Sequence, residues 1–332
     1  MVVGFIGAGS WGTILAVHLA SLGHDVLLWA HGDEQRAALR RDRENRLYLP
    51  GTPFPASVTI VDTPAEAVCA PVVVIATPTQ FIRQTLASVP SELLANNVVV
   101  SVSKGIERGS LLRISELLAE THGVQTERFV ALSGPSHAEE VARNIPTLVV
   151  AGGTSLANAT LVQDLFTSND LRVYTSDDLV GVELGGALKN VIAVCAGILD
   201  GLAFGDNTKA ALITRGLAEI TRLGVALGAH PQTFSGLSGL GDLVVTCTSR
   251  HSRNRHVGEQ IGRGRKLAEI IAEMDMVAEG VTTTQSADQL ATMRGVETPI
   301  IHKVHQVLFE DHDPREATYS LMSRQTRHEI WT

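Results

Sequence analysis

The stretch GAGSWG, at residues 7–12, limits most strongly what this chain can fold into. It stands directly after the apolar run 2–6 and at the start of a helical pattern over 10–22. A second strand pattern follows at 25–30. A strand, a glycine-rich turn, a helix and a second strand in this order are typical of a βαβ unit. The chain is therefore expected to begin with a parallel α/β sheet.

The same turn predicts a site for the pyrophosphate of a dinucleotide. Gly7 allows the tight turn, Gly9 lets the backbone approach the pyrophosphate, and Gly12 lets the helix pack on the strand. The free N–H groups of Ser10 and Trp11 at the helix start would meet the phosphates. A plain βα turn is the alternative interpretation.

The end of the second strand bears on which dinucleotide binds. An NAD site usually has an acidic residue there, but this chain has His31, and Asp33 and Glu34 come slightly late. A histidine does not repel a 2′-phosphate, and Arg36 and Arg40 follow within reach of one. The cofactors NADP(H) and NAD(H) are both expected, with NADP(H) mildly favoured.

Strand-like runs and helical patterns alternate through the first half of the chain. The strand-like runs lie at 2–6, 25–30, 57–61, 72–76, 98–103, 129–133, 147–151 and 171–175. The helical patterns between them include 10–22, 33–43, 110–120 and 156–167. Continuous Val/Ile runs suit strands covered on both faces, so a mostly parallel sheet is predicted. The pairing direction of the final strands is left open.

Strand signals nearly vanish in the second half. Helical patterns follow at 184–200, 208–228, 253–263, 266–274, 283–294, 299–310 and 314–323. We therefore expect an α/β Rossmann-type dinucleotide-binding domain over residues 1–182 and an all-α substrate domain over 183–332.

The composition excludes several classes of protein. A net charge of −8 argues against nucleic acid as the main partner. The three cysteines lie far apart without metal-ligand spacing, which indicates reduced thiols in a cytoplasmic protein and no metal site. No signal peptide is expected, and no uninterrupted apolar run of about 18 residues predicts a membrane span.

The segment LGGALKNVIAVCAGILDG places a lysine inside a pattern typical of a buried helix. Lys189 lies off the apolar face, among residues with almost no side chain: Gly185, Ala193, Ala196 and Gly197. A buried ammonium is costly unless something pairs with it. Either the lysine reaches the surface from a helix edge, or a ligand supplies a partner that the sequence does not.

Three more stretches carry candidate binding residues. SVSKGIE puts Lys104 just past the carboxyl end of a strand, where ligands of open α/β sheets bind. LSGPSHAEE places Gly134 and Ser136 past the next strand, and the glycine-rich loop GLSGLGDLVVTC carries Asp242. An ordinary loop lysine and an Asx-turn aspartate are the alternative interpretations.

SRHSRNRHVG gathers Arg250, Arg253 and Arg255 around Ser252 and Asn254. Ser252 is expected to cap a helix, with Arg253 and Asn254 in its first turn. Arginines there oppose the helix dipole unless an anion joins them. A phosphate would satisfy both the arginine fork and the free N–H groups. A solvated basic turn is the alternative.

These motifs resemble one known family. GAGSWGT, the loop around YLPG, SKGIE, SGPSHAEE, ELGGALKNVIA, GLGDLVVTCTS, SRNRHVG and VAEGVTT follow in that order across nearly the whole chain. Together they resemble the bacterial-type NAD(P)-dependent glycerol-3-phosphate dehydrogenases. That family reversibly reduces dihydroxyacetone phosphate to sn-glycerol 3-phosphate and feeds phospholipid synthesis. The resemblance implies a homodimer and a helical domain like that of 6-phosphogluconate dehydrogenase.

The resemblance also implies residue roles. Lys189 matches the family's catalytic lysine, the proton acceptor in oxidation of the C2 hydroxyl, with Lys104, Asn190 and Asp242 beside it. Positions matching those that hold glycerol phosphate are Lys104, Gly134, Ser136, Lys189, Asp242, Ser252, Arg253 and Asn254. Positions matching contacts to the dinucleotide are Ser10, Trp11, His31, Lys104, Ala138, Arg253, Val277 and Glu279.

Two other functions fit parts of the pattern. A β-hydroxyacid dehydrogenase of the 6-phosphogluconate type shares the architecture and a lysine base, and an arginine binds carboxylate as well as phosphate. A dinucleotide-sensing regulatory protein would retain GAGSWG without needing Lys189, Asp242 and the RNR turn together.

Overall fold

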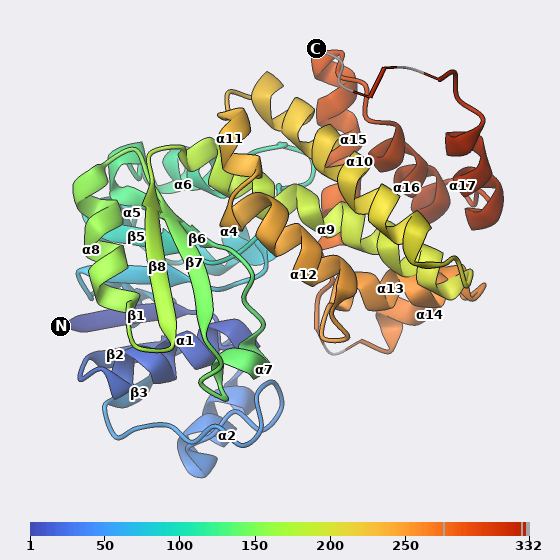
Figure 1. Ribbon diagram of the computed structural model, residues 1–332. Coiled ribbons are helices and arrows are strands. Elements are labelled where there is room, and N and C mark those ends of the chain that lie inside the picture. Colours follow the sequence, from blue (N-terminus) through green and yellow to red (C-terminus); the bar gives the residue numbers. More distant parts are fainter. Residues whose placement is uncertain (275, 327, 330–332) are drawn as a thin grey trace.

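The computed structural model describes residues 1–274, 276–326 and 328–329. An eight-stranded sheet with the order β3-β2-β1-β4-β5-β6-β7-β8 occupies the first half, and helices occupy the second (Figure 1). The strands are β1 (Val2–Ile6), β2 (Asp25–Trp29), β3 (Val58–Val61), β4 (Val72–Ile75), β5 (Val98–Ser101), β6 (Phe129–Ser133), β7 (Thr147–Gly152) and β8 (Leu171–Ser176). Every predicted strand is confirmed, as is the fold class.

The sheet is parallel except at one pairing. β6 and β7 run antiparallel, and β8 then pairs parallel to β7. This settles the direction that the sequence left open. The Val/Ile run of β4 is buried along its whole length because helices cover both faces of the sheet.

The longer helices of the first half were predicted and the short ones were not. α1 (Ser10–Ser21), α2 (Asp33–Asp42), α6 (Ile114–His122) and α8 (Leu156–Phe166) match predicted patterns. α6 begins later than expected because Gly109 and Leu111 have φ of 87° and 62°, outside the helical region. Four short helices carry too little periodicity to be recognised: α3 (Pro64–Val68), α4 (Ile82–Leu86), α5 (Ser91–Ala95) and α7 (Ala138–Val141).

Helix α9 (Leu179–Gly201) joins the two halves, and the predicted boundary between residues 182 and 183 lies inside it. It begins before the predicted start because the Asp178 carboxylate accepts the Gly181 N–H at 2.9 Å and caps the helix. Of the described helices it alone is long and apolar enough to cross a membrane, yet 94% of its apolar window is buried within the protein. It is packed as a core helix.

Most of the remaining helices pack around α9, whereas α14 packs on α13, and α17 on α16 and α13 (Figure 1). They are α10 (Asp206–Ala226), α11 (Pro231–Phe234), α12 (Asp242–Thr248), α13 (Arg253–Gly262), α14 (Leu267–Ala272), α15 (Glu279–Arg294), α16 (Pro299–Phe309) and α17 (Pro314–Met322). α13 lies so close to α9 that a Cβ on Gly258 would stand 1.9 Å from the Val194 carbonyl oxygen. One on Gly197 would stand 1.9 Å from the Arg255 carbonyl oxygen. Close helix packing therefore explains part of the small-residue face around Lys189.

Candidate functional site

Lys189 lies at the centre of the site, and it does not reach the surface. The residue is only 6% exposed. Its Nζ donates to Asp242 Oδ1 at 2.7 Å and to Thr246 Oγ1 at 2.5 Å. The expectation of an exposed lysine, or of one partnered only by a ligand, was wrong, because α12 supplies the pairing charge from within the chain.

Lys104 binds the other side of the same carboxylate. It follows the carboxyl end of β5, and its Nζ donates to Asp242 Oδ2 at 2.7 Å and to the Gly134 carbonyl oxygen at 3.0 Å. An ammonium has three donors, so each lysine keeps one N–H beyond its two protein partners. Two ammonium groups thus flank one buried carboxylate, and each keeps an N–H that can bind a further acceptor.

Asp242 was predicted to lie in a loop, and this prediction was wrong, because Asp242 lies in a helix. The glycine-rich stretch Leu237–Gly241 forms a π-helical turn that leads directly into α12, whose first residue is Asp242. Thr246 then stands one helical turn later and faces the same lysine, and its hydroxyl donates to the Asp242 carbonyl oxygen at 2.6 Å. The sequence analysis missed Thr246, although GDLVVT read as a helix would have placed it beside Asp242.

The electrostatics of the cluster follow from burial and from these pairs. Burial lowers the pKa of Lys189 to about 8; Asp242 opposes this shift and Lys104 reinforces it. Burial alone would raise the pKa of Asp242, but the two ammonium groups hold it below its usual value. Lys189 can therefore gain or lose a proton near neutral pH while Asp242 stays ionised.

A chain of amide side chains ties Lys104 to the helical half. Asn190 Nδ2 donates to the Lys104 carbonyl oxygen at 3.0 Å, and Asn254 Nδ2 donates to Asn190 Oδ1 at 2.9 Å. Asn254 Oδ1 accepts the Gly280 N–H at 2.9 Å. The structure thus brings together the predicted Lys104, Lys189, Asn190, Asp242 and Asn254.

Glu279, predicted to touch the dinucleotide, holds the two halves together. Its Oε1 accepts the Thr79 N–H at 2.6 Å and hydroxyl at 3.0 Å, and its Oε2 accepts the Lys104 N–H at 3.1 Å. Burial raises the pKa of Glu279, and these donors oppose that shift. The predicted Val277 lies half-buried just before it.

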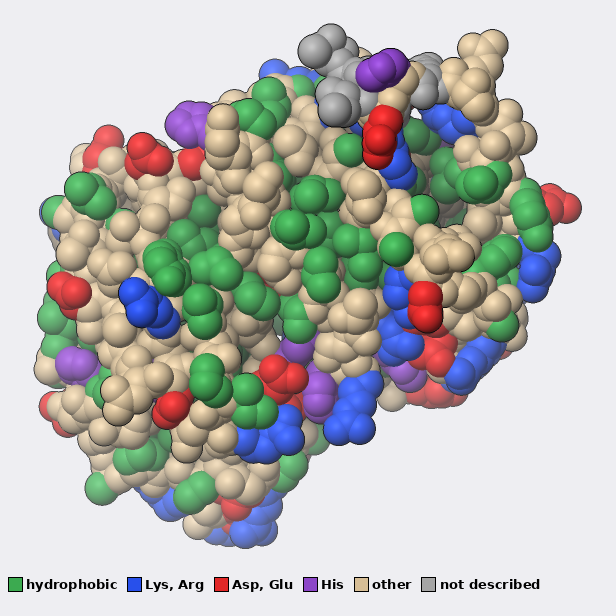
Figure 2. Space-filling view, viewed as in Figure 1, with side chains coloured by type: hydrophobic (Ala, Val, Ile, Leu, Met, Phe, Trp, Pro, Cys, Tyr) green, Lys and Arg blue, Asp and Glu red, His purple; other side chains and the backbone are tan. Residues whose placement is uncertain are grey.

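The residues of the basic turn, Ser252 to Arg255, have different partners and different roles. Ser252 caps α13, as predicted, by accepting the Arg255 N–H at 3.2 Å. Arg255 does not face a ligand, because its Nε binds Asp200 at 2.6 Å. Within the described part of the chain Arg253 has no hydrogen-bond or ion-pair partner, and it lies exposed beside buried Asn254. Figure 2 shows Lys, Arg and His side chains gathered along the lower junction between the two halves.

The residues of the dinucleotide turn fit a pyrophosphate. Gly7 has φ of 114°, which favours glycine, and a Cβ on Gly12 would lie 2.2 Å from the Gly7 carbonyl oxygen. A Cβ on Gly9 would meet no atom within 4 Å, so this side of the turn is open. Gly9 is the N-cap residue of α1, whose first residue is Ser10, and glycine has no side chain that could accept the N–H groups of the first turn. Among described residues the buried Trp11 Nε1 also has no hydrogen-bond partner.

After the end of β2, Asp33 is engaged by an arginine and His31 stands where an NAD site usually has an acidic residue. His31 is exposed and its ring lies 6.1 Å from that of Trp29, centroid to centroid. Asp33 forms an ion pair with Arg36, which also donates to the Ala30 carbonyl oxygen at 2.8 Å. Arg40 is likewise paired, with Asp62 at 2.5 Å. The predicted Ala138 is buried at the start of α7, in an apolar cluster against which Trp11 of the dinucleotide turn packs.

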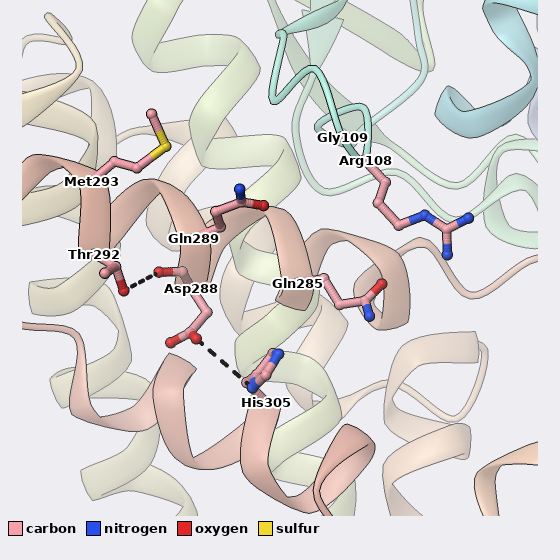
Figure 3. A pocket seen from close by; sticks show the side chains of 8 residues that line it. All are labelled: Arg108, Gly109, Gln285, Asp288, Gln289, Thr292, Met293 and His305. Carbon is pink, nitrogen blue, oxygen red and sulfur yellow. Dashed lines mark hydrogen bonds and ion pairs between the residues drawn. The ribbon is translucent and has the colours of Figure 1, made fainter.

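A surface hollow of about 460 Å³ lies outside this cluster (Figure 3). α15 contributes Gln285 and Asp288, α16 contributes His305, and the loop before α6 contributes Arg108. Figure 3 shows the Asp288 carboxylate turned toward His305. None of the lining residues is a predicted site residue.

A Rossmann-type sheet with a dinucleotide turn, and two lysines, one of them buried, that share a carboxylate from the helical half, define an NAD(P)-dependent oxidoreductase. The matching family models name the protein group: the N-terminus of NAD-dependent glycerol-3-phosphate dehydrogenase over residues 2–159, and its C-terminus over 178–319. The chain belongs to the NAD(P)-dependent glycerol-3-phosphate dehydrogenase family.

Similar proteins match over almost their whole length. Glycerol-3-phosphate dehydrogenase [NAD(P)+] of Chlorobium phaeobacteroides is 52% identical, with 99% of each chain covered. The enzyme of the same name from Lysinibacillus sphaericus is also 52% identical, with 98% of this chain and 97% of that protein covered. The crystal structure of glycerol-3-phosphate dehydrogenase from Coxiella burnetii superposes with a TM-score of 0.92 at 35% identity, covering 97% and 99% of the two chains.

Proposed function

We propose that this enzyme reversibly reduces dihydroxyacetone phosphate to sn-glycerol 3-phosphate, with Lys189 as the general acid and base. The single observation that carries this mechanism is the buried Lys104–Asp242–Lys189 cluster. The reaction needs a proton donor and a stabilising cation at the C2 oxygen, and each lysine keeps one N–H beyond its protein partners.

The bound dinucleotide supplies the hydride for C2 or accepts it. In reduction, Lys189 Nζ donates a proton to the C2 oxygen while Lys104 stabilises the negative charge that develops there. In oxidation, neutral Lys189 accepts the proton of the C2 hydroxyl as the hydride leaves C2. A pKa of about 8 suits both directions, because a general acid or base works best near the operating pH.

The phosphate of the substrate is proposed to bind at the turn formed by Ser252, Arg253 and Asn254. Support comes from Arg253, which has no hydrogen-bond or ion-pair partner among the described residues, and from its place at the N-terminus of α13. An anion there gains the arginine fork and the helix N–H groups together. Gly134 and Ser136 complete the proposed substrate site beside Lys104, since Ser136 Oγ donates to the Gly134 carbonyl oxygen at 2.9 Å.

The dinucleotide is proposed to lie across the turn of Gly7, Gly9 and Gly12, with Ser10 and Trp11 at its phosphates. His31 would then lie near the adenosine ribose, where it does not repel a 2′-phosphate. This supports use of NADPH at least as readily as NADH. Ala138, Val277 and Glu279 remain proposed contacts of the dinucleotide.

A homodimer in the reducing cytoplasm and a role in phospholipid synthesis complete the proposal. Exposed apolar side chains support association: Leu148, Tyr174, Leu240 and Val244, on β7, β8, the π-helical turn and α12. Figure 2 shows apolar side chains gathered on the face where these elements lie. Sedimentation equilibrium measures the mass directly, and a monomer at micromolar concentration would contradict the dimer.

The test of the proposed reaction is a rate assay with dihydroxyacetone phosphate and NADPH or NADH, followed at the nicotinamide absorbance. Lys189→Ala should lower kcat by about 10²–10⁴-fold, as loss of a general acid–base group typically does. Lys266→Ala is the matched control, because Lys266 belongs to the helical half and its side chain is 73% exposed. If kcat falls by less than about tenfold in Lys189→Ala while dinucleotide binding and fold are intact, Lys189 is not the general acid and base.

A further inference from the structure

One polar group beside the catalytic cluster has no role in the mechanism above. His137 stands between Ser136 and α7, and its Nε2 is buried without a hydrogen-bond partner among the described residues. A buried ring nitrogen is costly when nothing pairs with it, so such an atom beside a functional site is a candidate to bind a polar atom of the ligand.

The position of His137 joins the two ends of the proposed substrate site. On one side, its ring lies 5.8 Å from that of His251, which directly precedes the helix cap Ser252. On the other, the loop before it is fastened to the cluster, because the Gly134 carbonyl oxygen accepts from both Ser136 Oγ and Lys104 Nζ. His137 is therefore held at the junction of the lysine cluster and the proposed phosphate turn.

The charges around His137 make it a neutral hydrogen-bonding group. Burial and the ammonium groups of Lys189 and Lys104 lower its pKa, while the carboxylates of Glu139 and Asp242 oppose the shift. A neutral imidazole offers one donor and one acceptor rather than a charge. It matches a hydroxyl group better than a phosphate dianion.

The proposed substrate has one polar group without a partner. Its C2 oxygen is assigned to Lys189 and Lys104, and its phosphate to Arg253 and the start of α13. The C1 hydroxyl remains. We propose that Nε2 of His137 hydrogen-bonds the C1 hydroxyl of the three-carbon phosphate and so selects substrates that carry it. This inference rests on the proposed function, since it assumes that substrate lies between Lys189 and Arg253.

The experiment compares dihydroxyacetone phosphate with acetol phosphate, which has a hydrogen in place of the C1 hydroxyl. His137→Phe keeps a ring but removes the nitrogen. It should lower kcat/KM for dihydroxyacetone phosphate by about tenfold, because a hydrogen bond to a neutral group is worth about that factor. The kcat/KM for acetol phosphate and the inhibition constant of inorganic phosphate should stay within about twofold of the wild type.

His137→Gln guards against a folding defect, since its amide can reach the position of Nε2. It should recover most of the lost preference for dihydroxyacetone phosphate, and both variants should retain the wild-type Tm and NADPH affinity. Equal losses for both substrates, or weaker inhibition by phosphate, would overturn the C1 assignment, as would no change at all. A wild type that turns over neither substrate would instead refute the proposed function.

Discussion

Substituting Asp242 by Asn tests whether Lys189 is the group whose protonation governs the rate. The wild-type carboxylate holds two ammonium groups at 2.7 Å, one on each oxygen. Asn keeps the shape but loses the charge that opposes the lowering of the pKa of Lys189. Burial and the charge of Lys104, which both lower that pKa, then act alone.

The size of the effect follows from one charge-assisted hydrogen bond. Such a bond is worth about 1.5–3 kcal/mol, and one pKa unit corresponds to about 1.4 kcal/mol. The amide oxygen of Asn retains a part of this interaction. The pKa of Lys189, about 8 in the wild type, should therefore fall by about one to two units.

The measurement is kcat/KM for glycerol 3-phosphate oxidation against pH at saturating dinucleotide. Oxidation needs neutral Lys189, so the wild-type kcat/KM should rise with pH, reach half of its maximum at about pH 8 and level off above that pH. In Asp242→Asn the midpoint should move to lower pH, whatever the loss in absolute rate. Asp178→Asn is the control, because this buried carboxylate caps the start of α9 and has no contact with either lysine. An unchanged or raised midpoint in Asp242→Asn would refute the assignment.

Two further substitutions test the ends of the site. Arg253→Ala should raise the KM for dihydroxyacetone phosphate and weaken competition by inorganic phosphate, because it removes the arginine fork. An unaltered KM would mean that the turn is only a solvated surface. His31→Asp should move the NADPH/NADH ratio of kcat/KM toward NADH by at least about fivefold, since a close like-charge contact costs about 1 kcal/mol in water and more in a dry cleft. A strongly NADH-specific wild type would contradict the premise.

The strands and the dinucleotide turn were predictable because their signals are local. The Val/Ile run is enough to predict β4, and the spacing of the glycines in GAGSWG is enough to predict the turn, without knowledge of distant residues. The partner of Lys189 was not predictable in this way. Asp242 lies 53 residues further along the chain, and the π-helical turn before α12 disguised its helix as a loop.

Contacts between residues far apart in the chain could be predicted even less well from the local sequence. Glu279 binds Thr79 from 200 residues away, and nothing in either local sequence indicates that a carboxylate will fasten the helical half to the sheet. Only the resemblance marked Glu279 as part of the site, and it assigned a different partner. His137 was missed for a related reason, because a lone histidine in a loop shows no periodicity that predicts its burial.

The charges of the site are opposite in sign to the net charge of the chain, which is −8. Asp242 neutralises one of the two ammonium groups, and the carboxylate of Glu279 is engaged by the N–H groups of Thr79 and Lys104. Lys104, Lys189 and Arg253 carry three positive charges against the two negative charges of Asp242 and Glu279, so these five groups keep a net charge of about +1 to attract a phosphate ester, whose own charge near pH 7 is about −1.5 to −2. If the phosphate binds at Arg253 and the start of α13 as proposed, a phosphorylated three-carbon substrate should be preferred over a hydroxyacid, and competition by inorganic phosphate measures that preference.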